Sequence, residues 1–432
     1  MEQGFHKRNL FNLLNFLKAI TALIITSGIY VLLILLINIF AGNQLIYFIG
    51  GKNILLVRVI FIFSSIVIFI GIHECIIRIL GLNPNLKNNL RLLLISTMIC
   101  WIVIEIALSI LKINASNCEI TGNKTYNSLY FKSENENYPS NYTYNFPSNE
   151  FIFYRRTNSL GICDKEFDFN KADGEYRIIG CGDSFTVGVG VTEDSTWVRL
   201  LENTLNGAKK GKFSCINGGK AGSDPFFEYM LLKNTLIKYD PDMVILAVNE
   251  ADLHDISKRG GDERFQKEGN WSVMSPPDWE WVYASSYLFR FLMINGLHFN
   301  NFLVNRNEWE KIENQSKEKL YNKLKDFEIL AKQEGFHFIV AAFPAKVDFG
   351  NINNPLKDVI MKVQKYSKTN IVDLKDYFMK VEKINQSNIH KFYWTFDGHP
   401  RGKGQAAFAR GLALKLVEMG IIDTTKNKPC DK

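Results

Sequence analysis

The sequence predicts an α/β protein, a three-layer α/β/α sandwich with a parallel sheet, preceded by three transmembrane helices. One observation is that short apolar runs alternate with amphipathic segments from Tyr176 onward. This alternation is typical of a parallel sheet covered by helices on both faces. The other is that the first hundred or so of the 432 residues hold long runs of Leu, Ile, Phe and Val. A chain of this length is expected to fold as more than one region.

Three apolar segments predict a membrane anchor over residues 1–113. Residues 19–40 carry no charge and are long enough to cross about 30 Å of hydrocarbon. Further spans are expected at about 54–73 and 92–111, as helices, because lipid excludes irregular backbone. Positive side chains gather before the first span and between the second and third (Lys7, Arg8, Lys18, Arg78, Lys87 and Arg91). The positive-inside rule therefore predicts a cytoplasmic N-terminus and a periplasmic or extracellular location after Leu111.

Two charged residues, Arg58 and Glu105, interrupt the second and third spans at a similar predicted depth. We expect them to form an ion pair, because an unpaired charge in a membrane span costs about 3 kcal/mol. The alternative is that Arg58 extends to the interface and that Glu105 faces protein alone or is protonated.

The composition argues against several classes of function. The formal net charge of +7 is modest. The sequence has no Lys/Arg stripe with interleaved aromatic residues, so nucleic-acid binding is not indicated. None of the seven cysteines forms a Cys-x-x-Cys pair, so no zinc or redox motif is indicated and no metal or organic cofactor is expected. Cys118 and Cys163 either form a disulfide outside the cell or are free cysteines.

A polar segment, residues 114–170, is expected to form an extracytoplasmic stalk or cover. In the region 171–425, apolar runs predict five strands, at 177–181, 212–216, 243–248, 336–343 and 371–374. Helical spacing and capping residues predict helices at 195–205, 226–238, 309–334, 356–366 and 404–419. Residues 255–300 do not fit the alternation. We interpret them as an insertion, with Trp271, Trp279, Trp281 and Trp309 in or near it, that shapes a pocket rim or touches the membrane surface.

The residues that could carry chemistry follow the predicted strands in order. The run Gly180–Thr186 puts Ser184 on a sharp turn just past the first strand, where glycines let the backbone turn tightly. The run Asn217–Gly222 follows the second strand. The later candidates are Asn249 and Asp252 after the third strand, and Asp397 and His399 before the last helix. Because chemistry in parallel sheets sits at the carboxyl ends of the strands, these residues are expected to lie together.

Serine, glycine, asparagine and histidine in this order resemble the four blocks of the SGNH (GDSL-like) hydrolase family, over roughly residues 176–419. The resemblance implies a flavodoxin-like sheet and an esterase activity. It implies that Ser184 is the nucleophile, His399 the general base and Asp397 the acid that orients the imidazole. It also implies that the backbone N–H groups of Ser184 and Gly222 stabilise the oxyanion.

The third block departs from the family pattern. The family carries Gly-x-Asn-Asp after the third strand, and alignment on Asp252 puts Ala251 at the place of the asparagine. Asn249 stands two residues earlier, and it either supplies the third oxyanion donor in a rearranged loop or only caps the turn. Asp183 and Asp252 are expected to support the site. The last block is Asp-x-His where Asp-x-x-His is better known, and an exposed loop histidine is the alternative for His399.

The expected reaction is acyl transfer by a serine nucleophile acting on O-acyl esters of cell-envelope glycans or lipids. The lipid bilayer and this substrate are the expected partners. Two alternatives stay open: an O-acyltransferase that modifies an envelope polysaccharide, and a catalytically silent envelope-binding protein with the same fold.

Overall fold

A computed structural model describes most of the chain after residue 53. The described residues are 17, 18, 20, 21, 24–29, 32, 54–81, 84–111, 113, 138–208, 212–266, 283, 286–300, 303–350 and 354–422. The chain forms two compact units. We call residues 1–123 with 275–309 the helical unit, and residues 124–274 with 310–432 the sheet unit.

The sheet unit is built on five parallel strands in the order β4-β3-β5-β6-β7. Their bounds are β3 Glu175–Gly182, β4 Lys212–Gly219, β5 Met243–Val248, β6 His337–Ala342 and β7 Asn370–Asp373. The strand order reverses beside β3, which is the first of the five in the chain. In such open sheets, ligands bind beyond the carboxyl ends of the strands next to this reversal.

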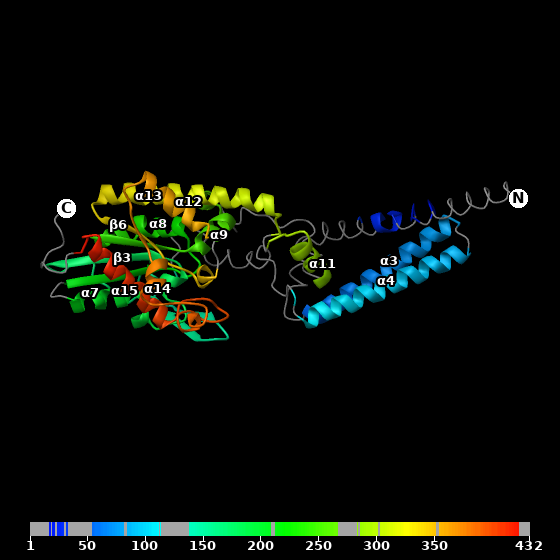
Figure 1. Ribbon diagram of the computed structural model, residues 1–432, viewed down its shortest axis with the longest axis horizontal. Coiled ribbons are helices and arrows are strands. Elements are labelled where there is room, and N and C mark those ends of the chain that lie inside the picture. Colours follow the sequence, from blue (N-terminus) through cyan, green and yellow to red (C-terminus); the bar gives the residue numbers. More distant parts are fainter. Residues whose placement is uncertain are drawn as a thin grey trace. The chain divides into compact units, whose positions relative to one another are not determined.

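Helices cover both faces of the sheet (Figure 1). One face packs against α8 Pro225–Asn234, α9 Glu250–Arg259, α12 Arg306–Glu334 and α13 Leu356–Tyr366. The other packs against α7 Trp197–Ala208, α14 Lys375–Lys380 and α15 Gly402–Glu418. Shorter helices are α6 Ser184–Val187, η1 Glu193–Ser195, η2 Leu236–Tyr239, η3 Gly261–Gln266, η5 Lys346–Phe349 and η6 Ile389–Lys391. The α/β fold with a parallel sheet is therefore confirmed.

The central strand β5 shows why the apolar runs predicted this arrangement. All six of its residues are buried. Val244, Leu246 and Val248 enter the core on one face, and Met243, Ile245 and Ala247 enter the core on the other. Because successive side chains of a strand point to opposite faces, a strand buried on both sides has to be continuously apolar.

A hairpin precedes the sheet, in a segment that showed no strand pattern. Strands β1 Thr143–Pro147 and β2 Ile152–Arg156 pair antiparallel. A small core under the hairpin joins it to the sheet unit, with Tyr138, Phe153, Cys163, Val187, Val189 and Ala221 as its buried members. Through this core the described part of residues 114–170, from residue 138 onward, packs on the rest of the sheet unit. The interpretation of the segment as an extracytoplasmic stalk or cover stays a prediction. Cys163 is a buried free thiol, and Cys118 lies outside the described residues.

The helical unit contains α3 Ile54–Ile79 and α4 Pro84–Ile110. Their facing ends are joined by a bidentate ion pair between Arg91 and Glu74. Of the helices in the described ranges, α4 alone is long and apolar enough to cross a membrane. Of the three predicted transmembrane helices, the structure thus supports one, the span at 92–111. The first predicted span, 19–40, lies largely outside the described residues.

The predicted insertion at 255–300 is divided between the units. Helix α9 and η3 extend the sheet unit to residue 266, whereas residues 275–309 belong to the helical unit. There the chain forms α11 Tyr287–Phe291 and the π-helix η4 Leu292–Gly296. Trp271, Trp279 and Trp281 lie outside the described residues.

Candidate active site

Ser184 is the first residue of α6 and follows β3 by two residues. The turn requires glycine at position 182, where φ is 153° and a Cβ would overlap the Oγ1 atom of Thr186. Since the first N–H groups of a helix have no partner within the helix, this placement presents the Ser184 N–H together with its hydroxyl. Ser184 and Phe185 are partly exposed, whereas Asp183 before them and Thr186 after them are buried.

Asp183 holds this turn from inside. It is 6% exposed, and its Oδ1 accepts a hydrogen bond from the Phe185 N–H at 2.8 Å. Its Oδ2 accepts a hydrogen bond from the Nδ2 atom of Asn249 at 2.9 Å. Asp183 therefore ties the turn that carries Ser184 to the loop after β5.

Asn249 occupies the position directly after the last residue of β5, and it caps α9. Its Oδ1 accepts from the Ala251 N–H at 2.8 Å, and its own N–H donates to Asp252 Oδ2 at 2.7 Å. These contacts form a capping box, so Asp252 is a helix-capping residue three positions later. Ala251 is exposed in the first turn of α9. The structure thus brings Asn249, rather than Ala251, beside the serine turn.

The turn at residues 220–223 brings the second block to the same place. Its closing bond joins the Ser223 N–H to the Lys220 carbonyl at 3.0 Å, and Gly222 has a φ of 72°. A type II turn requires a residue with a positive φ at its third position, which glycine adopts readily. The Gly182 carbonyl accepts from the Lys220 N–H at 3.0 Å and from the Ser223 hydroxyl at 3.1 Å. Gly222 is therefore fixed to the turn that carries Ser184.

His399 and Asp397 are hydrogen-bonded partners, from Nδ1 of the imidazole to Oδ1 of the carboxylate. Both side chains are about one-sixth exposed, at 16% and 15%. The His399 ring lies 5.8 Å, centroid to centroid, from the ring of Phe185, the residue after Ser184. His399 is therefore a partnered residue at the site, unlike the exposed loop histidine of the alternative interpretation.

Two residues that support the site were not predicted. The Glu150 carboxylate accepts hydrogen bonds from the backbone N–H groups of Thr395, Phe396 and Asp397, at 2.9, 2.7 and 2.8 Å. It thereby fixes the loop that carries Asp397 and His399. Gln405 is fully buried, and its Nε2 donates to the Phe185 carbonyl at 2.9 Å. Neither contact has a local sequence signal, because the partners lie more than 200 residues apart.

The carboxylates of the site differ in their electrostatics. Burial raises the pKa of Asp183, although hydrogen bonds from Asn249 and Phe185 oppose the shift. Burial and the neighbouring negative charge of Asp183 raise the pKa of Asp252 well above its ordinary value. For Asp397, burial acts to raise the pKa, but the hydrogen bond and charge of His399 lower it overall. Asp397 is therefore the carboxyl suited to remain ionised beside the imidazole.

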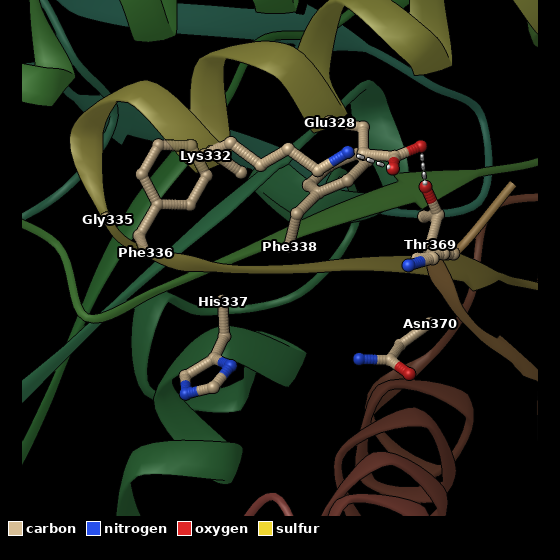
Figure 2. A pocket seen from close by; sticks show the side chains of 10 residues that line it. Glu328, Lys332, Gly335, Phe336, His337, Phe338, Thr369 and Asn370 are labelled. Carbon is tan, nitrogen blue, oxygen red and sulfur yellow. Dashed lines mark hydrogen bonds and ion pairs between the residues drawn. The ribbon is translucent and has the colours of Figure 1, made fainter. Parts of the chain in front are cut away.

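A pocket elsewhere in the sheet unit is separate from these residues (Figure 2). It has a volume of about 320 Å³ and includes the first residues of β6 and β7, His337 and Asn370. Ser184 follows the opposite, carboxyl end of its strand. The Glu328 carboxylate in this pocket is already bonded to Lys332 and Thr369 (Figure 2). No group of three or more His, Cys, Asp or Glu side chains in the described part of the chain is arranged to hold a metal ion.

No family model matches the sequence, and no curated protein matches it. Similar solved structures include TesA, at 16% identity over 56% of this chain and 99% of that chain, with a TM-score of 0.35. Axe2, an acetylxylan esterase from Geobacillus stearothermophilus, is 16% identical over 59% and 97% of the two chains, with a TM-score of 0.35. A G-D-S-L family protein from Desulfitobacterium hafniense DCB-2 is 13% identical over 55% and 98%, with a TM-score of 0.33. TM-scores this low carry no argument about the activity of this chain.

Proposed function

We propose that the protein is a serine esterase of the SGNH type that acts on O-acyl esters. The observation that carries the proposal is the bonded pair of Asp397 and His399, whose imidazole lies against the residue that follows Ser184. A serine hydroxyl is a weak nucleophile until a neighbouring base takes its proton, and a base works best when a third group orients it. All three groups are at the carboxyl edge of one sheet.

In this mechanism, the Ser184 Oγ attacks the ester carbonyl while the Nε2 atom of His399 takes the hydroxyl proton. Asp397 accepts the Nδ1–H and stabilises the imidazolium. Collapse of the tetrahedral intermediate breaks the bond to the leaving alcohol, which takes the proton back from His399. Water then attacks the acyl-serine with His399 again as the base, which releases the carboxylic acid and restores the serine.

The oxyanion of this intermediate needs donors that are already in place. The N–H groups of Ser184 and Gly222 are two of them. The third is the Nδ2 group of Asn249, which has two N–H bonds and uses one of them for Asp183. The Oδ1 atom of Asn249 accepts a hydrogen bond from the Ala251 N–H, so a flip of the side-chain amide would break both this bond and the bond to Asp183. The second N–H is thus available for the substrate.

The substrate class follows from the predicted location. An apolar helix such as α4, together with Arg78 in the last turn of α3 and Lys87 and Arg91 near the start of α4, supports a catalytic unit on the periplasmic or extracellular side. O-acylated envelope glycans and lipids are the esters within reach there. An acyltransferase would use the same acyl-serine and differ only in the acceptor, a sugar hydroxyl in place of water.

Hydrolysis of p-nitrophenyl acetate by the full chain in detergent tests the proposal. We expect turnover that is lost in Ser184→Ala and kept in Ser195→Ala, since Ser195 has an exposed hydroxyl outside the site. A fluorophosphonate probe should label wild type and not Ser184→Ala. Absence of both turnover and labelling would favour the silent envelope-binding protein. Transfer of the acetyl group to an added oligosaccharide would favour the transferase.

A further inference from the structure

We infer that residues 286–297 lie in the lipid leaflet reached by the C-terminal end of α4, and that Glu105 of α4 fixes them there. This segment interrupts the sequence of the sheet unit but belongs to the helical unit, as α4 does. The inference concerns an interaction surface with lipid and does not depend on the proposed esterase activity.

The Glu105 carboxylate is bonded to the start of α11. It accepts hydrogen bonds from the Ser286 hydroxyl at 3.0 Å, from the Leu288 N–H at 2.9 Å and from the Tyr287 N–H. Glu105 is only 8% exposed on a helix whose other surface is largely exposed and apolar. The side chain of Arg58 lies outside the described residues, so its pairing with Glu105 stays a prediction. The bonds to residues 286–288 give Glu105 a structural role of its own.

The position of Glu105 along α4 sets the depth of the segment. It lies five residues before the end of the helix, which is about 8 Å along the axis at 1.5 Å per residue. Backbone at such a depth has to satisfy its N–H groups within the protein. The first three N–H groups of α11 bond to Glu105 and to the Ser286 hydroxyl, and the fourth, of Arg290, bonds to the Ser286 carbonyl. The start of α11 therefore meets the requirement for entering lipid.

The one charged side chain of α11 is withdrawn from the surface. Arg290 is 1% exposed, its Nε donates to the Tyr283 carbonyl at 2.7 Å, and its guanidinium lies 4.9 Å from the centre of the Tyr287 ring. The exposed side chains that follow are Phe291, Leu292 and Leu297. Asn295 and His298 are also exposed. This mixture suits the boundary between headgroups and acyl chains, where amphipathic segments lie.

Lipid is the occupant that the neighbouring helix already requires. Helix α11 packs against α4, whose exposed residues near the same end include Ile102, Val103, Ile106 and Ile110. Acyl chains that cover this end of α4 would continue over the apolar side chains of α11. The apolar face is thus continuous with the surface of a helix that is long and apolar enough to cross a membrane.

Fluorescence quenching in vesicles of phosphatidylcholine tests the location. A bimane label is attached at Leu292→Cys, with Cys75, Cys100, Cys118 and Cys430 replaced by alanine in the full chain. The matched control is Met361→Cys on α13, because the two positions are equally exposed at 50% and 49%. We expect doxyl-labelled lipid to quench the label at 292 several-fold more than the label at 361, and aqueous iodide to show the reverse order. Quenching by iodide at both positions, or by neither agent at 292, would overturn the inference, the latter in favour of a protein partner.

The role of Glu105 is tested by the same label. In Glu105→Leu the N–H groups of Tyr287 and Leu288 lose their acceptor, so the label at 292 should become several-fold more accessible to iodide. Glu105→Gln keeps one acceptor oxygen and should fall between wild type and Glu105→Leu. An unchanged accessibility in Glu105→Leu would show that Glu105 does not hold the segment.

Discussion

The Nδ2 atom of Asn249 donates to the Oδ2 atom of Asp183 at 2.9 Å, and this bond joins the loop after β5 to the turn that carries Ser184. Both side chains are buried. The proposed mechanism uses this amide as an oxyanion donor. In that mechanism Asp183 is a positioning residue, which acts on the reaction through Asn249 and through the Phe185 N–H.

Asp183→Asn should lower kcat by about tenfold to a hundredfold with little change in KM, because misplaced catalytic groups cost that much. The new amide has one acceptor oxygen where the carboxylate served two donors, so an NH₂ group would face the Nδ2 of Asn249 or the N–H of Phe185. Steady-state hydrolysis of p-nitrophenyl acetate measures the effect. A rise in KM at constant kcat would contradict a positioning role.

Asn249→Ala should reduce kcat by about 10²–10³, the usual cost of losing one oxyanion donor. Ala251→Ser is the matched control, since Ala251 stands at the place expected from alignment on Asp252 but is exposed on α9. We expect it to leave the rate unchanged. An unchanged rate in Asn249→Ala would show that its side chain does not serve as an oxyanion donor.

Glu150→Ala should lower kcat by about tenfold or more, because it frees the loop that holds Asp397 and His399. The carboxylate accepts three backbone N–H groups there, and these bonds lower its pKa despite the opposing effect of burial. Glu166→Ala is the control, since Glu166 also binds a turn, through the N–H and hydroxyl of Ser159. The rate of labelling by the fluorophosphonate probe measures the effect. A wild-type labelling rate in Glu150→Ala would show that Glu150 is not needed to hold the loop.

Gly182→Ala should destabilise the sheet unit and abolish turnover. Alanine is strained at a φ of 153°, and its Cβ would overlap Thr186. Gly207→Ala is the control, because Gly207 lies in α7 with open space around it and alanine favours helix. Thermal unfolding followed by circular dichroism should show a lower midpoint for Gly182→Ala only. A wild-type midpoint for Gly182→Ala would contradict the requirement for glycine.

The free energy of unfolding should fall less steeply with rising pH in Asp252→Asn than in the wild type. The pKa of Asp252 is raised in the folded protein, so above about pH 4 the folded state keeps a proton that the unfolded state has released. Its stabilising effect is therefore greatest in acid and is lost progressively as the pH rises toward the folded pKa. Asparagine can still accept the Asn249 N–H. Unfolding midpoints of the wild type and of Asp252→Asn, measured between pH 5 and pH 8, test this prediction. Parallel curves for the two proteins would show that Asp252 is ionised over the whole range.

The sheet could be predicted because its signal is local. Strand β5 is a continuous apolar run and β6 is one after His337, as burial on both faces requires. The hairpin β1–β2 could not be predicted, because burial in β2 does not follow hydrophobicity: Ile152 and Tyr154 are exposed, whereas Arg155 is buried as Phe153 is. Its stability comes from contacts with the sheet unit and not from its own sequence.

The third block shows where sequence alignment was ambiguous. Asp252 resembles the acid that follows the family's asparagine, but it is the partner of Asn249 in a capping box. The pattern Asn-x-x-Asp before a helix is visible in the sequence and favours Asn249 as the cap. What the sequence could not show is the bond to Asp183, which lies 66 residues away. The contribution of Glu150 is likewise a tertiary contact without a motif.

The division of the chain has a consequence for separating the sheet unit from the helical unit by proteolysis. The sequence passes between the two units three times, near residues 123, 274 and 309. A protease that cuts only in the segment 114–137 would separate the two ends of the chain and still leave the sheet unit tethered through residues 275–309. A fragment free of the helical unit would require cuts on both sides of that returning segment, and the two pieces would then have to stay together through the packing of α12 and α9 on the same sheet.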